Sequence, residues 1–404
     1  MKVIHFNTTD RGGAARAGLR LHEGLLHSGI DSTYAVKHQY SEIPGVIEVP
    51  SNQRQSSYRT WLDRQIRWQR KKRSAKAIEA RLVISECRTS HRPEDFELLG
   101  IPDIYQLHWI ANYIDWSTTL PWLTQRAPIV WRLPDMNAFS GIFHYEPDDL
   151  LLNPCLRHWD SKVRKIKREA LASINPEKLI IVGPSRWIAG QAQKSEALGR
   201  FRTEVIPNAL NVKKYTQMNQ EEARRQLGID PDTKVIDLAA DDLADPRKGI
   251  QPAIRAIQQG KRKDSLLLTI GSHTTDDSLA TRQMNLGYLR SDTELSQFYS
   301  ALDLFLMPSL QESFGQTCLE SLACGTPVIA FNSGGIPDMV RPGQTGWLVP
   351  TGDFNAMSDT IDKALKNSST LNSMRTTCRR VAETEFNLET QSAAYTKIYE
   401  SLTP

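Results

Sequence analysis

The chain opens with an apolar run, a glycine turn and an amphipathic segment. Residues 3–6 are largely apolar, and the sequence Asp-Arg-Gly-Gly at 10–13 interrupts them. Between residue 14 and Gly29 apolar side chains recur at near-helical spacing, and residues 33–36 form a second apolar run. This order predicts a βαβ unit, in which a crossover helix joins two parallel strands.

Short apolar runs of the same kind recur along both halves of the chain. They lie at residues 104–107, 129–133, 179–182, 235–238, 266–270, 304–307 and 327–331. Because helical patterns lie between several of them, the sequence predicts an α/β protein with two doubly wound parallel sheets. Proline and asparagine at 207 and 208 predict a domain boundary, and residues 386–402 predict a terminal helix.

The composition mainly excludes certain classes of protein and site. Of 404 residues, 40% are hydrophobic and 24% charged, which is typical of a globular protein, and the net charge of +4 is too small to indicate a nucleic-acid binder. The 5 cysteines are scattered without a Cys-x-x-Cys pair, which argues against disulfides and zinc and favours a reducing cytoplasm. We expect neither a signal peptide nor a membrane span, since no sufficiently long apolar run is present.

One segment departs from this average. Residues 54–81 are strongly basic, and Trp61 and Trp68 lie on one face of the helix that the segment could form. Such a helix could lie on an anionic membrane surface. It could equally be a solvated helix whose tryptophans pack on the sheet, with basic stems covering apolar surface.

The most informative stretch is 309–338. It begins just after the predicted strand 304–307, and Glu312 stands in the turn that follows. Residues 316–323 predict a helix that contains Glu320. Open α/β sheets bind ligands at the carboxyl ends of their strands, and the start of a helix is a site for phosphate.

The two glutamates flank this predicted phosphate site. Carboxylates accept hydrogen bonds from pairs of sugar hydroxyls, and a nucleotide sugar carries a ribose diol, a diphosphate and a hexose. One glutamate on the ribose and one near the hexose would fit that ligand. The alternative is that Glu312 and Glu320 are ordinary loop and helix carboxylates.

The sequence SLQESFGQTCLESLACGTPVIA, with its Glu-x7-Glu pair, resembles the signature of the retaining glycosyltransferases of family 4. Other motifs of that family recur over most of the chain: Gly12-Gly13, PSRW (184–187), IPNALNVKKY (206–215), DPRKG (245–249), LGYL (286–289), DLFLMPS (303–309) and GGIPDMV (334–340). The stretches LHWI (107–110) and GIFHY (141–145) resemble a subgroup acting in bacterial exopolysaccharide assembly.

The resemblance implies the GT-B architecture, in which two Rossmann-like domains face each other across a cleft. Residues 1–206 would form the acceptor-side domain, 207–385 the nucleotide-sugar domain, and 386–404 a terminal helix returning towards the first. The implied location is cytoplasmic, with peripheral attachment to the inner face of the membrane through residues 54–81 as an alternative. No nucleic-acid partner is implied.

The resemblance also assigns donor contacts. Glu320 resembles the glutamate on the ribose hydroxyls, Glu312 the one that contacts the donor hexose, and Lys248 the lysine on the diphosphate. A lysine there would stabilise the charge that develops on the leaving group. The remaining implied donor contacts are main-chain amides, a nucleobase loop and a glycine of the first turn: Phe314, Gly315, Gln316 and Thr317; Gly287, Tyr288 and Leu289; and Gly13.

This sequence departs from the family at two places. An arginine usually precedes the motif lysine by about six residues, but Ala-Asp-Asp stands at 240–242, so Arg247 is the candidate replacement. A histidine usual on the acceptor side is replaced by Pro134. His108, His144 and Asp135 are then the candidates to line the acceptor side, with His108 and Asp135 as catalytic candidates. A purely structural role is the alternative for each histidine.

The expected reaction is transfer of a hexose, glucose from UDP-glucose as the first choice, with retention of configuration. The acceptor would be a saccharide or a lipid-linked oligosaccharide in exopolysaccharide assembly. A GDP-mannose-dependent mannosyltransferase and a nucleotide-sugar epimerase of the same architecture are the alternatives, and a non-enzymatic carbohydrate-binding protein is a third. Neither a cofactor nor a metal is expected, because Asp230-Pro231-Asp232 precedes a strand and predicts a turn. The glycine turn lacks the G-x-G-x-x-G of nicotinamide-dependent dehydrogenases.

Overall fold

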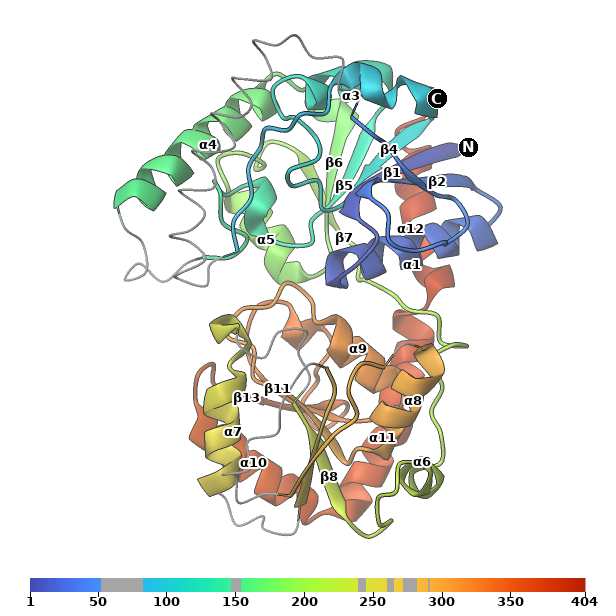
Figure 1. The fold of residues 1–404 in the computed structure, drawn as a ribbon, viewed down its shortest axis with the longest axis vertical. Coiled ribbons are helices and arrows are strands. Elements are labelled where there is room, and N and C mark those ends of the chain that lie inside the picture. Colours follow the sequence, from blue (N-terminus) through green and yellow to red (C-terminus); the bar gives the residue numbers. More distant parts are fainter. Residues whose placement is uncertain are drawn as a thin grey trace. The chain divides into compact units, whose positions relative to one another are not determined.

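The computed structural model of the chain describes residues 1–51, 83–146, 154–238, 245–259, 265–271, 282–289 and 291–403. It divides into two compact units, one made of residues 1–206 and 392–404 and the other of residues 207–391. Each unit contains a parallel sheet with helices on both faces (Figure 1). The basic segment 54–81 and the departure at 240–242 lie outside the described residues, so the predictions made for them stay predictions.

The N-terminal unit is built on a seven-stranded sheet in the order β3-β2-β1-β4-β5-β6-β7. Its strands are β1 (Lys2–Thr9), β2 (Asp31–His38), β3 (Val46–Glu48), β4 (Ile104–Leu107), β5 (Ile129–Arg132), β6 (Leu179–Gly183) and β7 (Arg202–Val205). Its helices are α1 (Gly13–His27), α3 (Thr119–Arg126), α4 (Pro154–Ala172) and α5 (Arg186–Lys194), with the 3-10 helices η1 (Pro93–Leu99), η2 (Met136–Ala138) and η4 (Pro176–Lys178).

The C-terminal unit repeats this winding in a six-stranded sheet of order β10-β9-β8-β11-β12-β13. Its strands are β8 (Lys234–Asp237), β9 (Ser265–Thr269), β10 (Arg282–Asn285), β11 (Leu304–Met307), β12 (Val328–Phe331) and β13 (Gly346–Val349). Its helices are α6 (Gln220–Gln226), α7 (Ile250–Gln259), α8 (Asp292–Ala301), α9 (Gln316–Ala323), α10 (Phe354–Leu365) and α11 (Ser368–Glu385), with η5 (Pro246–Lys248) and η6 (Ile336–Asp338). Helix α12 (Leu388–Glu400) begins in this unit and belongs to the N-terminal unit from Ser392 onward.

Alternation along the strands supplies a core on each face of each sheet, because successive side chains point to opposite faces. In the C-terminal unit Val235 joins the core under α8, α9 and α11, whereas Ile236 joins the core under α7 and α10. In the N-terminal unit α1 and α12 cover one face, and α3, α4 and α5 cover the other. The chain therefore contains two parallel-sheet, Rossmann-like α/β domains, as predicted.

In the part of the chain that is described, no helix is both long and apolar enough to cross a membrane.

Candidate functional site

Two loops meet at the point where the winding of the C-terminal sheet reverses, between β8 and β11. Ligands of open α/β sheets bind at such switch points, outside the carboxyl ends of the strands. The loop after β8 ends at Gly249, where φ is 64° and an added Cβ would lie 2.2 Å from the Pro308 carbonyl oxygen after β11. The Leu310 amide donates to the Arg247 carbonyl at 2.8 Å. Backbone contact thus fixes one loop against the other.

This contact brings Lys248 and Glu312 together. Lys248 Nζ lies 2.6 Å from Glu312 Oε2, and Arg247 Nη1 lies 3.9 Å from the same oxygen. Arg247 also donates to the Gln311 carbonyl at 2.9 Å and pairs with Asp245. Burial opposes ionisation of Glu312, but the attraction of Lys248 and Arg247 outweighs it, so the pKa of Glu312 is lowered. The structure therefore places an ionised carboxylate between two cations at the switch point.

A glycine turn after β12, formed by Gly334 and Gly335, holds Glu312 from the other side. The Gly335 amide donates to the Glu312 carbonyl at 2.8 Å. At Gly334, where φ is 54°, an added Cβ would lie 1.9 Å from that carbonyl oxygen, so only glycine fits. The loops after β8, β11 and β12 are thus joined around one glutamate.

Helix α9 begins directly behind this glutamate. Gly315 occupies the N-cap position with φ of 100° and has no side chain with which to cap the first turn. Phe314 is buried in the core, while Gln316 and Thr317 are half-buried. An α9 start at Gln316 matches the predicted helix, and its positive dipole end suits an anion. Anion binding there by residues 314–317 stays a prediction.

Glu320 lies deeper than Glu312. Its side chain is fully buried in α9, and the Tyr299 hydroxyl of α8 donates to its Oε2 at 3.2 Å. Contact between this carboxylate and a ribose stays a prediction.

The predicted nucleobase loop follows β10. Gly287 adopts φ of 69°, and its carbonyl accepts from the Gly271 amide after β9 at 2.7 Å. Tyr288 is 71% exposed, whereas Leu289 packs against the core. Contact of this loop with a nucleobase, which the resemblance implied largely through the backbone, stays a prediction.

In the N-terminal unit, the loop after β1 carries the first glycine turn. Gly12 has φ of 86°, and Gly13 opens α1 with no atom within 4 Å of an added Cβ. Asp10 fixes the turn, since its carboxylate accepts from the amides of Tyr40 and Ser41. The turn therefore leaves room beside Gly13. The structural role of Asp10 was not predicted, because nothing in the sequence indicated it.

His108 lies in a buried cluster of rings. Its Nε2 lies 2.9 Å from His5 Nδ1, and Arg132 Nε donates to its Nδ1 at 3.0 Å. The ring of Tyr34 stacks on both histidines. Burial, with Arg132 and the neighbouring histidines adding to it, holds the pKa of His108 well below its ordinary value. His108 is thus a neutral interior side chain, with both ring nitrogens engaged.

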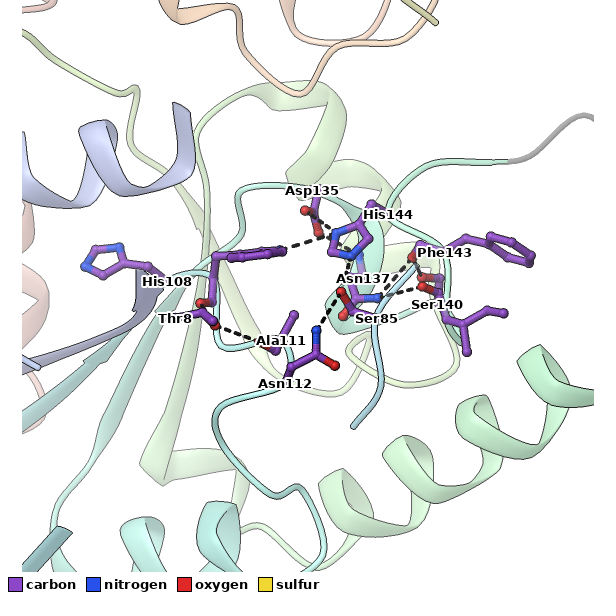
Figure 2. Close-up of polar contacts among 12 residues, drawn as sticks. Thr8, Ser85, His108, Ala111, Asn112, Asp135, Asn137, Ser140, Phe143 and His144 are labelled. Atoms are coloured by element: carbon purple, nitrogen blue, oxygen red, sulfur yellow. Dashed lines mark hydrogen bonds and ion pairs between the residues drawn. The ribbon is translucent and has the colours of Figure 1, made fainter. Parts of the chain in front are cut away.

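Asp135 and His144, by contrast, come together near the surface. His144 Nδ1 lies 2.6 Å from Asp135 Oδ2, and His144 Nε2 lies 2.7 Å from Ser85 Oγ (Figure 2). Asp135 follows β5 and also caps η2, because its Oδ1 accepts from the Asn137 amide at 2.9 Å. Ser85 was not among the predicted residues, since nothing in its sequence surroundings distinguishes it.

Within the described residues, no group of three or more His, Cys, Asp or Glu side chains could hold a metal ion. Asp230 closes a turn, as predicted, with its Oδ1 accepting from the Asp232 amide at 2.9 Å. The cysteines within the described ranges are all free thiols.

Comparison with known proteins identifies the relatives of the C-terminal unit. Residues 219–381 match the family model described as Glycosyl transferases group 1, so this unit carries a glycosyltransferase group 1 domain. A D-inositol 3-phosphate glycosyltransferase of Nocardia farcinica is 27% identical over 307 residues, which cover 70% of this chain and 63% of that protein. Its namesake from Mycobacterium sp. (strain JLS) is 32% identical over 295 residues, covering 70% and 62%. The chain thus spans less than two thirds of the length of these curated relatives.

Solved structures of low sequence identity share the fold. Sucrose-phosphate synthase from Thermosynechococcus elongatus superposes with a TM-score of 0.71 at 18% identity, over 99% of this chain and 98% of that chain. Anabaena Alr3699/HepE, crystallised with UDP-glucose, gives a TM-score of 0.67 at 16% identity over the whole of both chains. These similarities establish GT-B, with two Rossmann-like domains, as the fold class.

Proposed function

We propose that this chain is a retaining glycosyltransferase that moves glucose from UDP-glucose to a hydroxyl of a saccharide acceptor. The observation that carries the proposal is the partly buried Lys248–Glu312 pair at the switch point of a glycosyltransferase group 1 domain. A lysine and a glutamate held 2.6 Å apart suit a ligand whose phosphates need a cation and whose hydroxyls need an acceptor. The Anabaena structure with UDP-glucose supports the choice of donor.

The proposed chemistry is a displacement on one face of the sugar. The bond between the anomeric carbon and the diphosphate oxygen breaks, and its electron pair leaves with the diphosphate. The acceptor oxygen bonds to the same face of that carbon, and its proton passes to the leaving phosphate. Lys248 and the start of α9 would stabilise the negative charge, so no metal is required.

Each domain would have its own task in this reaction. The C-terminal unit would hold the donor, with Glu312 on the hexose, Glu320 on the ribose and Tyr288 at the base. The N-terminal unit would bind the acceptor. Of the two catalytic candidates there, Asp135 is the stronger, since both ring nitrogens of His108 are engaged inside the cluster.

The acceptor has two candidate classes. A growing saccharide or lipid-linked oligosaccharide of exopolysaccharide assembly follows from the LHWI and GIFHY motifs, with residues 54–81 as the surface that would meet the membrane. D-inositol 3-phosphate follows from the names of the curated relatives. The two acceptor classes differ in charge, so an assay in which they compete for the enzyme will distinguish them.

The test is to incubate the protein with UDP-glucose or GDP-mannose, with and without each acceptor, and to measure nucleoside diphosphate release. We expect release of UDP with an α-linked product seen by NMR, and no loss of rate in a chelator. Lys248→Ala should lower the rate by about 10²–10³-fold, because one donor to the leaving group is removed.

Lys366→Ala is the matched control, since Lys366 is an exposed lysine at the end of α10. It should retain the full rate. An epimerised nucleotide sugar formed without any acceptor would favour the epimerase instead. Full activity of Lys248→Ala would remove the lysine from the proposed site.

A further inference from the structure

We propose that Asp135 binds the acceptor hydroxyl, and that His144 and Ser85 are the positioning residues that hold its carboxylate for this task. The inference rests on the proposed function and deepens it, because it identifies the hydroxyl-binding group of the N-terminal unit. Three side chains from two segments form one hydrogen-bonded chain, with the contacts Asp135–His144 at 2.6 Å and His144–Ser85 at 2.7 Å. Figure 2 shows the chain in one view.

The exposed fractions of the three side chains show which end of the hydrogen-bonded chain faces the surface. The Asp135 side chain is 13% exposed, whereas His144 is 4% and Ser85 5% exposed. Asp135 is therefore the member that reaches the surface. Each of its oxygens accepts one hydrogen bond, Oδ1 from the Asn137 amide and Oδ2 from His144, and a carboxylate oxygen can accept a second. The outward lone pairs suit a neutral hydroxyl.

The short contact also assigns the imidazole protons. His144 Nδ1 lies 2.6 Å from Asp135 Oδ2, whereas the Trp109 indole nitrogen lies 3.3 Å from the same Nδ1, so we assign the Nδ1 proton to the shorter contact with the carboxylate. Nε2 then accepts from the Ser85 hydroxyl, which fixes the ring plane. The indole of Trp109 lies against the same ring. These contacts hold the Asp135 side chain in one rotamer.

The same three residue types act as a nucleophilic triad in acyl hydrolases, but the order from surface to interior is reversed here. In that chemistry the serine is the exposed member and attacks the substrate. Here Ser85 lies at the inner end, so the geometry favours a carboxylate that accepts a hydrogen bond over a serine that forms an ester.

The loop that carries Asp135 and His144 is anchored rigidly. Lys167 of α4 donates to the Asn137 carbonyl at 2.5 Å and to the Gly141 carbonyl at 2.7 Å. At Gly141 an added Cβ would lie 2.1 Å from Asp160 Oδ1, so α4 packs directly against the loop. The Met136 amide closes the loop by donating to the His144 carbonyl at 2.9 Å.

The segment that carries Ser85 is fixed to this loop as well. The Ser85 amide donates to the Ile142 carbonyl at 2.8 Å. Asn112 donates to Ser85 Oγ at 3.5 Å and accepts from the Glu86 amide at 3.0 Å, with a left-handed φ of 59°. A non-glycine residue in that conformation is strained, and such strain persists where the surroundings enforce it. Groups held this firmly can orient a substrate.

The experiment compares four variants with wild type: Asp135→Asn, His144→Ala, His144→Asn and Ser85→Ala. UDP release from UDP-glucose is measured alone and with methyl α-D-glucopyranoside or D-inositol 3-phosphate as the acceptor probe. Asp135→Asn should lower acceptor-dependent turnover by about 10²-fold, because the carboxylate that accepts a hydrogen bond from the acceptor hydroxyl is replaced by a neutral amide. His144→Ala should raise the acceptor KM by about tenfold or more.

Two variants separate positioning from folding. His144→Asn places an amide N–H where Nδ1–H stood, so it should recover most of the turnover that His144→Ala loses. The thermal shift given by UDP should stay at its wild-type value in all four, because the proposed donor-binding residues lie in the C-terminal unit. His158→Ala, an exposed histidine of α4, is the matched control and should behave as wild type.

The outcomes are distinguishable. Wild-type acceptor kinetics in Asp135→Asn, or an equal fall of release with and without acceptor, would overturn this inference and leave the donor site intact. Hydrolysis of p-nitrophenyl acetate that disappears in Ser85→Ala would show the nucleophilic triad instead. A wild-type protein that neither binds UDP nor releases it would overturn the proposed function, and this inference with it.

Discussion

Two carboxyl groups in the C-terminal unit have opposite environments. Glu312 lies beside Lys248 and Arg247, which lower its pKa against the effect of burial. Asp237, at the end of β8, is fully buried, and among the described residues no side chain bonds to its oxygens, which have only the backbone of Leu238 beside them. Burial raises the pKa of Asp237 well above its ordinary value. Asp237 is therefore a neutral acid in the interior, and Glu312 is an ionised one.

Asp237→Val should stabilise the protein. A buried carboxyl without partners costs about 1–3 kcal/mol, and valine suits a strand interior. The unfolded chain ionises Asp237 above about pH 3.9 while the folded chain keeps it protonated, so its contribution to stability falls as pH rises. The gain in urea-unfolding free energy should be larger at pH 7 than at pH 4. A variant less stable than wild type at pH 7 would contradict this.

At the residue scale, the sequence predicted which charged side chains belong to a site better than it predicted what packs around each side chain. The family resemblance implied that Glu312 and Lys248 share a donor site, and the structure brings the two side chains together. His108 was read as an acceptor-side candidate, but whether a histidine is exposed depends on what packs over it, here His5 and Tyr34. Ser85 could not be found, because its partners lie 27 and 59 residues away in sequence.

At the scale of elements, one backbone contact brings the site together. Gly249 combines a left-handed φ with close approach to the Pro308 carbonyl, so a side chain there meets two obstacles. Gly343 shares the left-handed conformation, with φ of 76°, but has no atom within 4 Å of an added Cβ. A substitution at Gly343 therefore tests the left-handed backbone strain alone, whereas one at Gly249 tests that strain together with steric crowding.

Gly249→Ala should lower UDP release strongly, because the loop after β8 must move away and carry Lys248 from Glu312. Gly343→Ala should keep wild-type release and lose only about 1–2 kcal/mol of unfolding free energy, the cost of a left-handed alanine. Both values come from steady-state assays and urea unfolding. Equal activity in the two variants would show that the loop contact does not position the site.

The strands show what an apolar run can predict. Every inner strand of the two sheets coincides with a predicted run, because both of its faces are covered by helices. The edge strands β3, β7, β10 and β13 were missed. β7 and β10 have the sequences RTEV and RQMN and only intermediate or exposed positions, so hydrophobic pattern carries no signal there.

At the scale of the whole molecule, the two units share one winding without sharing a sequence repeat. In both sheets the first strand lies between its second and its fourth, which creates one switch point in each unit. The two doubly wound parallel sheets followed from periodicity, whereas the GT-B architecture was implied by the family resemblance. Local pattern does not encode which loops approach one another, so the Lys248–Glu312 pair and the Ser85–His144–Asp135 chain required the structure.

The central claim is that the C-terminal switch point binds a nucleoside diphosphate at Lys248. Isothermal titration calorimetry of UDP into wild type, Lys248→Ala and Lys366→Ala tests it most directly. We predict one binding site in wild type, the same affinity in Lys366→Ala and an affinity about 10–100-fold lower in Lys248→Ala, the value of one charge-assisted hydrogen bond. Equal affinity in all three proteins, or no binding of any nucleoside diphosphate by wild type, would contradict the claim.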